Sequence, residues 1–196
     1  MRAVTMAREA AKFDAQCDLA ALVFGKPDEP DRLLSEFVQE LMIQGHRVVG
    51  LVQTRLDDGS AAVSVLPTGE TIPLAPRQDS LANSSRPGPC DLGRAAAAVD
   101  ALIESGADLV IINRFGKLEA EGTGLVDKIA RALSLDIPVV VAVPEFRFLK
   151  WLSFCNGMGV KLPCRDGSLR NWWNAMIVGE PLSEHLRRKR ICELLK

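Results

Sequence analysis

The 196-residue sequence lacks an excess of charge of either sign, since its formal net charge is −1. A near-neutral chain has no global field that attracts nucleic acid, so we expect no nucleic-acid partner. The sequence also lacks an apolar run near the roughly 18 residues needed to cross a bilayer, and we expect no membrane span. Residues 1–17 contain no apolar h-region, so we expect no secretory signal.

Cysteine and histidine are sparse as well. The five cysteines are scattered without a CxxC pair, which favours reduced thiols and a cytoplasmic location over a disulfide framework. His46 and His185 are the only histidines, so the sequence offers no convincing tetrahedral zinc site. We therefore predict no metal ligands, and the sequence identifies no cofactor.

The composition is that of a globular protein, with 47% hydrophobic and 25% charged residues. We predict a flexible extension over residues 1–17, a single α/β domain over 18–180 and a charged C-terminal helix over 181–196. Short apolar runs typical of buried strands alternate with helical periodicity along the domain. The expected strands cover residues 19–24, 47–53, 61–66, 70–74, 107–113, 138–143 and 160–162, and the expected helices include 33–42 and 168–178.

Strands that alternate with helices predict a three-layer α/β fold with a mostly parallel sheet. The segments 61–66 and 70–74 are joined across Pro67-Thr68-Gly69 and predict a β-hairpin inserted into that sheet. We expect a phosphate-loop-like topology.

The most informative stretch is an apolar strand that ends in Asn113 and Arg114. Ligands bind outside the carboxyl ends of parallel strands, so this edge is the expected site. We predict ligand contacts there from Asn113, Arg114, Gly116 and Lys117. The alternative is a solvated loop that carries a surface pair between Lys117 and Glu121.

The loop after the first strand begins at Gly25, where a phosphate-binding loop would begin. The pattern G-x-x-x-x-G-K-[ST] would end at residues 30–32, which are Pro, Asp and Arg, so its second glycine, lysine and hydroxyl are missing. Asp28, Glu29 and Asp31 add negative charge, and we interpret them as acids that cap the following helix. Gly25 and Lys26 stay as candidate contacts for an anion.

Three further residues are candidates because they lie near expected element ends. Gln53 and Arg55 stand at the end of the second strand. Cys90 precedes Asp91, which we predict to cap a helix, so Cys90 would lie where helix N-termini favour thiolates and anions. An ordinary loop thiol is the open alternative for Cys90.

The run from Leu109 to Leu125 resembles the hallmark of an uncharacterised bacterial family, domain of unknown function 2478. Segments 19–25, 45–53 and 87–92 extend the resemblance, which implies a molybdenum context because genes of that family often lie beside molybdate-transport genes. More distantly, the order of elements is similar to THEP-type nucleoside-triphosphatases with a phosphate-loop fold. The sequence departs from them at the phosphate loop and at the strand-end acids.

Three functions follow as hypotheses. The leading one is a binding or accessory protein for molybdenum metabolism that holds an oxyanion or another small anion and lacks hydrolytic residues. The second is a divergent nucleotide hydrolase or transferase, with Glu119 or Glu121 as base and Arg114 on phosphate. The third is a dimerising regulatory subunit, a homodimer or a partner of a molybdenum-pathway protein, in which the tryptophans and the basic C-terminal tail form an interface.

Overall fold

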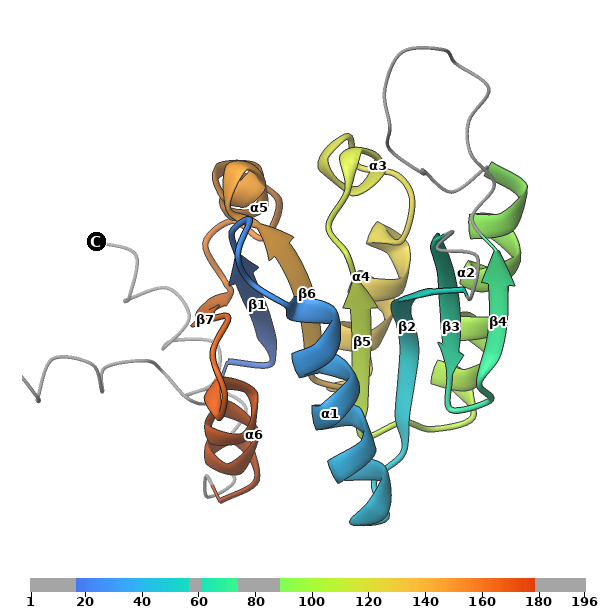
Figure 1. Ribbon diagram of the computed structural model, residues 1–196, viewed down its shortest axis with the longest axis horizontal. Coiled ribbons are helices and arrows are strands. Elements are labelled where there is room, and N and C mark those ends of the chain that lie inside the picture. Colours follow the sequence, from blue (N-terminus) through green and yellow to red (C-terminus); the bar gives the residue numbers. More distant parts are fainter. Residues whose placement is uncertain (1–16, 57–60, 74–88, 179–196) are drawn as a thin grey trace, which may run out of the picture.

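The computed structural model of the protein describes residues 17–56, 61–73 and 89–178. The predicted N-terminal extension, the loop after the hairpin and the predicted C-terminal helix lie outside these residues. The described strands form one seven-stranded sheet in the order β4-β3-β2-β5-β6-β1-β7 (Figure 1). They are β1 (Leu19–Phe24), β2 (Val48–Arg55), β3 (Ala61–Leu66), β4 (Glu70–Pro73), β5 (Leu109–Asn113), β6 (Val139–Pro144) and β7 (Val160–Pro163).

Helices connect these strands as the apolar periodicity predicts. They are α1 (Pro30–Ile43), α2 (Pro89–Glu104), α3 (Lys117–Ala120), α4 (Val126–Ser134), α5 (Phe148–Phe154) and α6 (Ser168–Val178), with a 3-10 turn at Glu145–Arg147. The four-residue α3 was not predicted from sequence. The predicted cap at Asp91 is wrong, because α2 already begins at Pro89. Proline suits the first helical position, where its fixed φ is preorganised and its missing N–H has no partner to lose.

The sheet is parallel except at one edge, as predicted. β1 pairs in parallel with β6 and β7, and β5 pairs in parallel with β2 and β6. The hairpin β3–β4 adds two antiparallel strands beside β2. Gly50 allows the close approach of β2 to β5, since its φ is +137° and an added Cβ would lie 2.0 Å from the Ile111 carbonyl oxygen.

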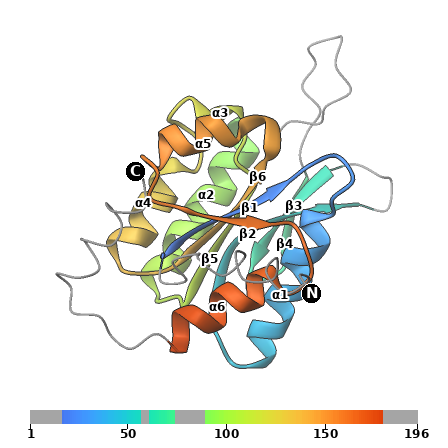
Figure 2. The ribbon, with the colours of Figure 1, turned by 90° about the vertical axis from the view of Figure 1, so that its left-hand side faces the viewer.

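Each face of the sheet buries its own apolar cluster. Helices α1 and α6 cover one face, and α2, α4 and α5 cover the other (Figure 2). Strands β5 and β6, near the middle of the sheet, are buried along their whole length. Strands buried on both faces read as continuous apolar runs, which is why the sequence located them.

The tryptophans belong to these cores. Trp151 lies on the buried side of α5, and Trp172 and Trp173 lie on the buried side of α6, with exposures of 1%, 3% and 5%. The hypothesis that tryptophans form a dimer interface is therefore wrong for these side chains, which are already covered within one chain. No helix among the described residues is both long and apolar enough to cross a membrane.

Candidate functional site

The carboxyl ends of β1, β5 and β6 meet at one edge of the sheet, where α1 also begins (Figure 1). β1 leads through residues 25–29 into α1, whose first residue is Pro30. β5 ends at Asn113 and leads into the loop before α3. Because β6 lies between β1 and β5 and all three run in parallel, these two loops face each other across one strand.

Asp31, in the first turn of α1, joins the two loops. Its Oδ1 accepts a hydrogen bond from Asn113 Nδ2 at 2.7 Å, and both of its oxygens lie 3.3 Å from Arg114 Nη2. The Arg114 guanidinium also lies over the Phe24 ring, 5.2 Å from the ring centroid. We call Phe24, Asp31, Asn113 and Arg114 the Asp31 cluster.

Two buried polar atoms of this cluster have no partner among the described residues, namely Asn113 Oδ1 and Arg114 Nε. Asn113 is 6% exposed. A buried donor or acceptor without a partner costs about 1–3 kcal/mol, so native proteins rarely leave one without a reason such as a water, an ion or a ligand. The cluster therefore keeps one donor and one acceptor that no described residue uses.

The loop between β1 and α1 is closed by its own acids. The Gly25 N–H donates to Asp28 Oδ2 at 2.6 Å, so a carboxylate occupies the place that an anion would need. Glu29 is the N-cap residue of α1 but makes no side-chain capping bond, and it pairs instead with Arg32 at 3.0 Å. The prediction that these acids cap α1 through side-chain hydrogen bonds is therefore wrong. Asp31 still complements the helix dipole in the first turn.

Glu119 is a structural residue of the β5–α4 connection. It is 5% exposed, and its two carboxylate oxygens accept the Gly116 N–H at 2.8 Å and the Leu125 N–H at 3.1 Å. A carboxylate held by two backbone donors has no free oxygen directed at a substrate. Its assignment as a catalytic base does not fit this geometry, and Glu121 alone stays as a candidate base.

The other predicted residues lie around the same edge without joining the cluster by any bond that the structure describes. Lys117 lies 3.6 Å from Glu121 on the exposed face of α3, the arrangement of the surface-pair alternative. Gly116 is the N-cap of α3, Gln53 is half-buried on β2, and Lys26 is exposed. Arg55 ends β2 and Cys90 lies in the first turn of α2, while their side chains and that of Asp91 are outside the described part.

Sequence reasoning missed Asp31 and Phe24 as partners of Arg114, and it missed Cys164 beside them. The only signal for Asp31 was an acid directly after Pro30 in the first helical turn, which capping already explained. Cys164 is a free, half-buried thiol. The pKa of Cys164 is raised to about 11, mainly by burial and also by the carboxylates of Asp28 and Asp31, while Arg32 lowers it.

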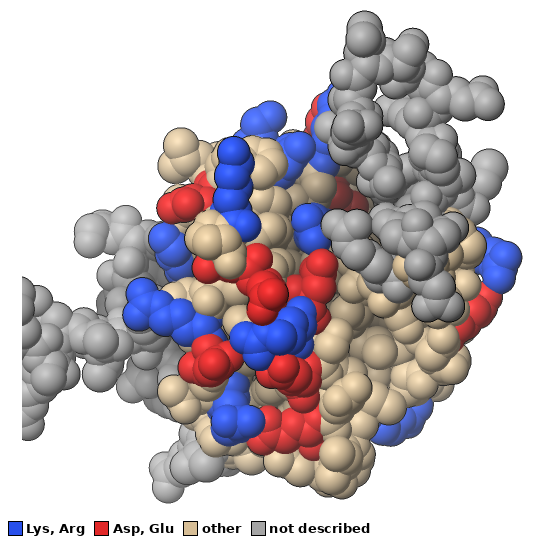
Figure 3. All heavy atoms as spheres, in the orientation of Figure 1, with Lys and Arg blue, Asp and Glu red and all other residues tan. Residues whose placement is uncertain are grey.

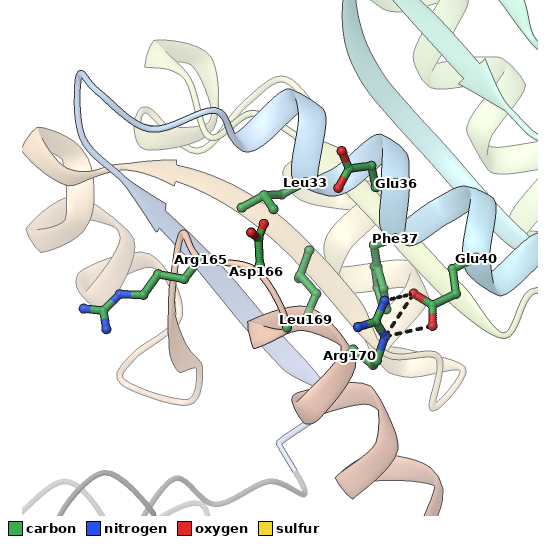
Figure 4. Close-up of a pocket in the computed structure, with 9 residues that line it drawn as sticks. Leu33, Glu36, Phe37, Glu40, Arg165, Asp166, Leu169 and Arg170 are labelled. Carbon is green, nitrogen blue, oxygen red and sulfur yellow. Dashed lines mark hydrogen bonds and ion pairs between the residues drawn. The ribbon is translucent and has the colours of Figure 1, made fainter. Parts of the chain in front are cut away.

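A groove of about 290 Å³ lies between α1 and the start of α6 (Figure 4). Its charged side chains are largely satisfied by each other: Arg170 Nε donates to Glu40 Oε1 at 2.8 Å, and Asp166 pairs with Arg32 at 3.2 Å. The hydrogen bond from Arg170 lowers the pKa of the Glu40 carboxyl. Acidic and basic groups are intermixed on this face (Figure 3), so the groove presents no field of one sign. The Asp31 cluster is the stronger candidate.

No group of three or more His, Cys, Asp and Glu side chains in the described part of the chain is placed to hold a metal ion. At the carboxyl edge, the guanidinium of Arg114 can bind an anion, and the oxygens of Asp31 can accept a hydrogen bond from a donor.

The mostly parallel sheet with helices on both faces has a phosphate-loop NTPase-like α/β fold, as the likeness to a solved structure of that fold shows. Among solved structures, THEP1 from Aquifex aeolicus matches with a TM-score of 0.56 and 14% identity, over 79% of this chain and 95% of that one. A human cancer-related nucleoside triphosphatase also matches, with a TM-score of 0.44 and 14% identity over 90% of this chain and 94% of that one.

The chain belongs to the family described as "Protein of unknown function (DUF2478)", whose sequence profile matches residues 19–172. This confirms the resemblance carried by the 109–125 run. A relative from Bradyrhizobium diazoefficiens, named molybdenum import ATP-binding protein ModC 2, is 37% identical over 161 residues, or 79% of this chain. The match spans only 18% of that protein's length.

Proposed function

We propose that this protein is a cytoplasmic accessory protein of molybdenum metabolism that binds a small anionic ligand at the Asp31 cluster, on an NTPase-like scaffold without hydrolytic residues. The proposal is carried by Arg114 Nε and Asn113 Oδ1, which are buried without a partner among the described residues, at the edge where such sheets bind ligands. The remaining proposed contacts are Lys26, Gln53, Arg55, Cys90, Asp91, Gly116 and Lys117, whereas the N–H of Gly25 already donates to Asp28.

Three features support a binding protein over a hydrolase. Residues 30–32 lack the glycine, lysine and hydroxyl that cradle phosphates and magnesium. The strand-end position that holds an acid in phosphate-loop enzymes is Asn113, whose amide is bonded to Asp31. Glu119 is engaged by two backbone N–H groups. No group among these is placed to activate a nucleophile.

The molybdenum context rests on the relative's printed name and on the 37% identity of the shared segment. That segment is a small part of a longer protein, so the relative's activity need not reside in it. We propose that this chain serves the same metabolism through its own ligand site.

The test is calorimetric titration and thermal shift of the protein with molybdate, tungstate, sulfate, phosphate and common nucleotides, with and without magnesium. A ligand that binds only the folded state raises the melting temperature by mass action. Arg114→Ala should abolish the response to an anion. Arg131→Ala is the matched control, because it removes an exposed arginine that pairs with Glu104, away from the Asp31 cluster.

A nucleotide response that requires magnesium would favour the hydrolase or transferase alternative. The fold class is the observation behind that alternative, and Glu121→Gln would then test the base. A protein that responds to no anion and no nucleotide would contradict the proposed ligand site and leave a regulatory subunit, alone or with a molybdenum-pathway partner.

A further inference from the structure

In the Asp31 cluster, the negative charge of Asp31 offsets the positive charge of Arg114. This pairing affects which anion can bind. Asp31 and Arg114 form an ion pair, yet the side chain of Asp31 is 42% exposed and that of Arg114 is 36% exposed. Asp28 lies in the adjoining loop, and a Cβ added at Gly25 would lie 3.5 Å from a carboxylate oxygen of Glu145. An oxyanion that approaches Arg114 therefore meets the Asp31 carboxylate beside the guanidinium, and an unprotonated ligand oxygen is repelled there.

Asp31 is held in place as a hydrogen-bond acceptor. Its bond from Asn113 Nδ2, at 2.7 Å, comes from a side chain that is buried at the end of an inner strand. A carboxylate can only accept, so the amide must turn Nδ2 towards Asp31, and Oδ1 is left without a partner among the described residues. The site thus presents a fixed, solvent-accessible acceptor directly beside its guanidinium.

We infer that Asp31 is the specificity-determining residue of this site, and that the ligand is an oxyanion which carries its own hydrogen-bond donor. Hydrogen phosphate is the simplest member of this class. This inference rests on the proposed function, since it names the ligand class of the same site. The O–H of the ligand donates to the Asp31 carboxylate, and the guanidinium of Arg114 donates to the remaining oxygens.

Sulfate and molybdate fall outside this class. Both are fully deprotonated at neutral pH, so their oxygens would face the Asp31 carboxylate as acceptor against acceptor. A site built to hydrogen-bond a donor strongly rejects an analogue that lacks it, because its own polar group is then left unpaired. The ligand that serves molybdenum metabolism would then be a protonated or hydroxyl-bearing anion and not free molybdate.

The experiment is calorimetric titration of the full chain with inorganic phosphate, sulfate and molybdate at one pH and one ionic strength. Wild-type protein should bind phosphate at least about tenfold more tightly than sulfate or molybdate. Asp31→Asn removes the negative charge and supplies a donor, so sulfate binding should rise and the phosphate preference should fall to near one.

Asp136→Asn is the matched control. It makes the same change of charge at an exposed loop residue outside the cluster, with φ of 55°, a conformation that asparagine tolerates. This variant should keep the wild-type preference for phosphate.

Equal affinities of the wild-type protein for phosphate and sulfate would overturn the inference and leave the anion site standing. The same conclusion follows if folded Asp31→Asn protein keeps the full phosphate preference. Absence of binding by all three anions would overturn both the inference and the anion-site proposal. The wild-type comparison decides the matter even if the variant does not fold.

Discussion

Two carboxylates at the same edge of the sheet, Glu119 and Asp31, have opposite environments. Glu119 is buried, and each of its oxygens accepts one backbone N–H. Asp31 is partly exposed and is bonded by two side chains, Asn113 and Arg114, that each keep an unpartnered atom within the described structure. Both acids lie in the first turn of a helix that follows a strand-end loop, and the sequence does not show how completely each carboxylate is bonded.

The difference shows that satisfaction of polar groups separates a structural acid from a candidate ligand site. A fully bonded, buried carboxylate stabilises the loop around it. Its removal leaves its hydrogen-bond partners unpaired, which lowers the free energy of unfolding. A partly exposed carboxylate whose partners are incompletely bonded can exchange them for a ligand. Stability should therefore depend on Glu119, and binding should depend on the Asp31 cluster.

The largest expected effect is loss of stability in Glu119→Ala. The variant leaves the N–H groups of Gly116 and Leu125 without their charged acceptor, and we expect the free energy of unfolding to fall by about 3 kcal/mol. Urea unfolding monitored by tryptophan fluorescence measures it. Glu121→Ala is the control, because its pairing with Lys117 is exposed and worth at most about 0.5 kcal/mol. Equal losses in the two variants would remove the distinction drawn between the acids.

A smaller loss is expected from Gly124→Ala, which tests how closely the chain wraps around Glu119. Gly124 has φ of +68°, and an added Cβ would lie 2.2 Å from Glu119 Oε1. Gly122 has a similar φ of +78° but no atom within 4 Å of its added Cβ, so Gly122→Ala reports the backbone strain alone. We expect a loss of about 1 kcal/mol for Gly122→Ala and about twice that for Gly124→Ala, by urea unfolding. Identical losses would mean that the contact with Glu119 is unimportant.

The smallest effect should be a shift in the titration of Cys164, whose thiol senses the charge of the Asp31 cluster. Because the pKa of Cys164 is raised to about 11, its alkylation followed by peptide mass spectrometry should reach half its maximal rate near pH 11. The carboxylate of Asp31 contributes to the raised pKa, so Asp31→Asn should move the midpoint to lower pH, and Asp136→Asn should not.

The raised pKa of Cys164 also determines how the stability of the protein changes with pH. The folded state holds the Cys164 proton more tightly than the unfolded chain, whose thiol has its ordinary pKa of 9.0. The contribution of Cys164 to stability is complete below pH 9 and is lost as the pH rises from about 9 to about 11. A midpoint for alkylation near pH 9 would contradict the burial of this thiol.

Most of the fold could be predicted because its signals are local. The runs at 19–24 and 109–113 are continuous and apolar, and the helical spacing of Leu33, Phe37 and Leu41 marks the buried side of α1. Glycine and proline marked the turn between β3 and β4. The start of α2 was misjudged because proline and aspartate are both good residues for a helix N-terminus.

The sequence predicted where on the fold the site lies, but not which side chains contact one another there. The apolar strand that ends in Asn113 and Arg114 indicated the carboxyl edge of a parallel sheet, and Arg114 does lie there beside Asp31. Glu119 was misjudged because its partners are backbone N–H groups, which have no sequence signature. Asp31 was assigned to helix capping because its partners are more than 80 residues away.

The sequence by itself determined the alternation of strands and helices, and with it the family, since periodicity and turn residues act over neighbouring positions. Only the tertiary structure decided which acid became a structural anchor and which became part of a ligand site. Asp31 and Asn113 are 82 residues apart, and they meet because α1 connects β1 to β2 across β6 and β5, which places its first turn at the end of β5. Strand order is set by packing of the whole sheet, so no local pattern could have specified that contact.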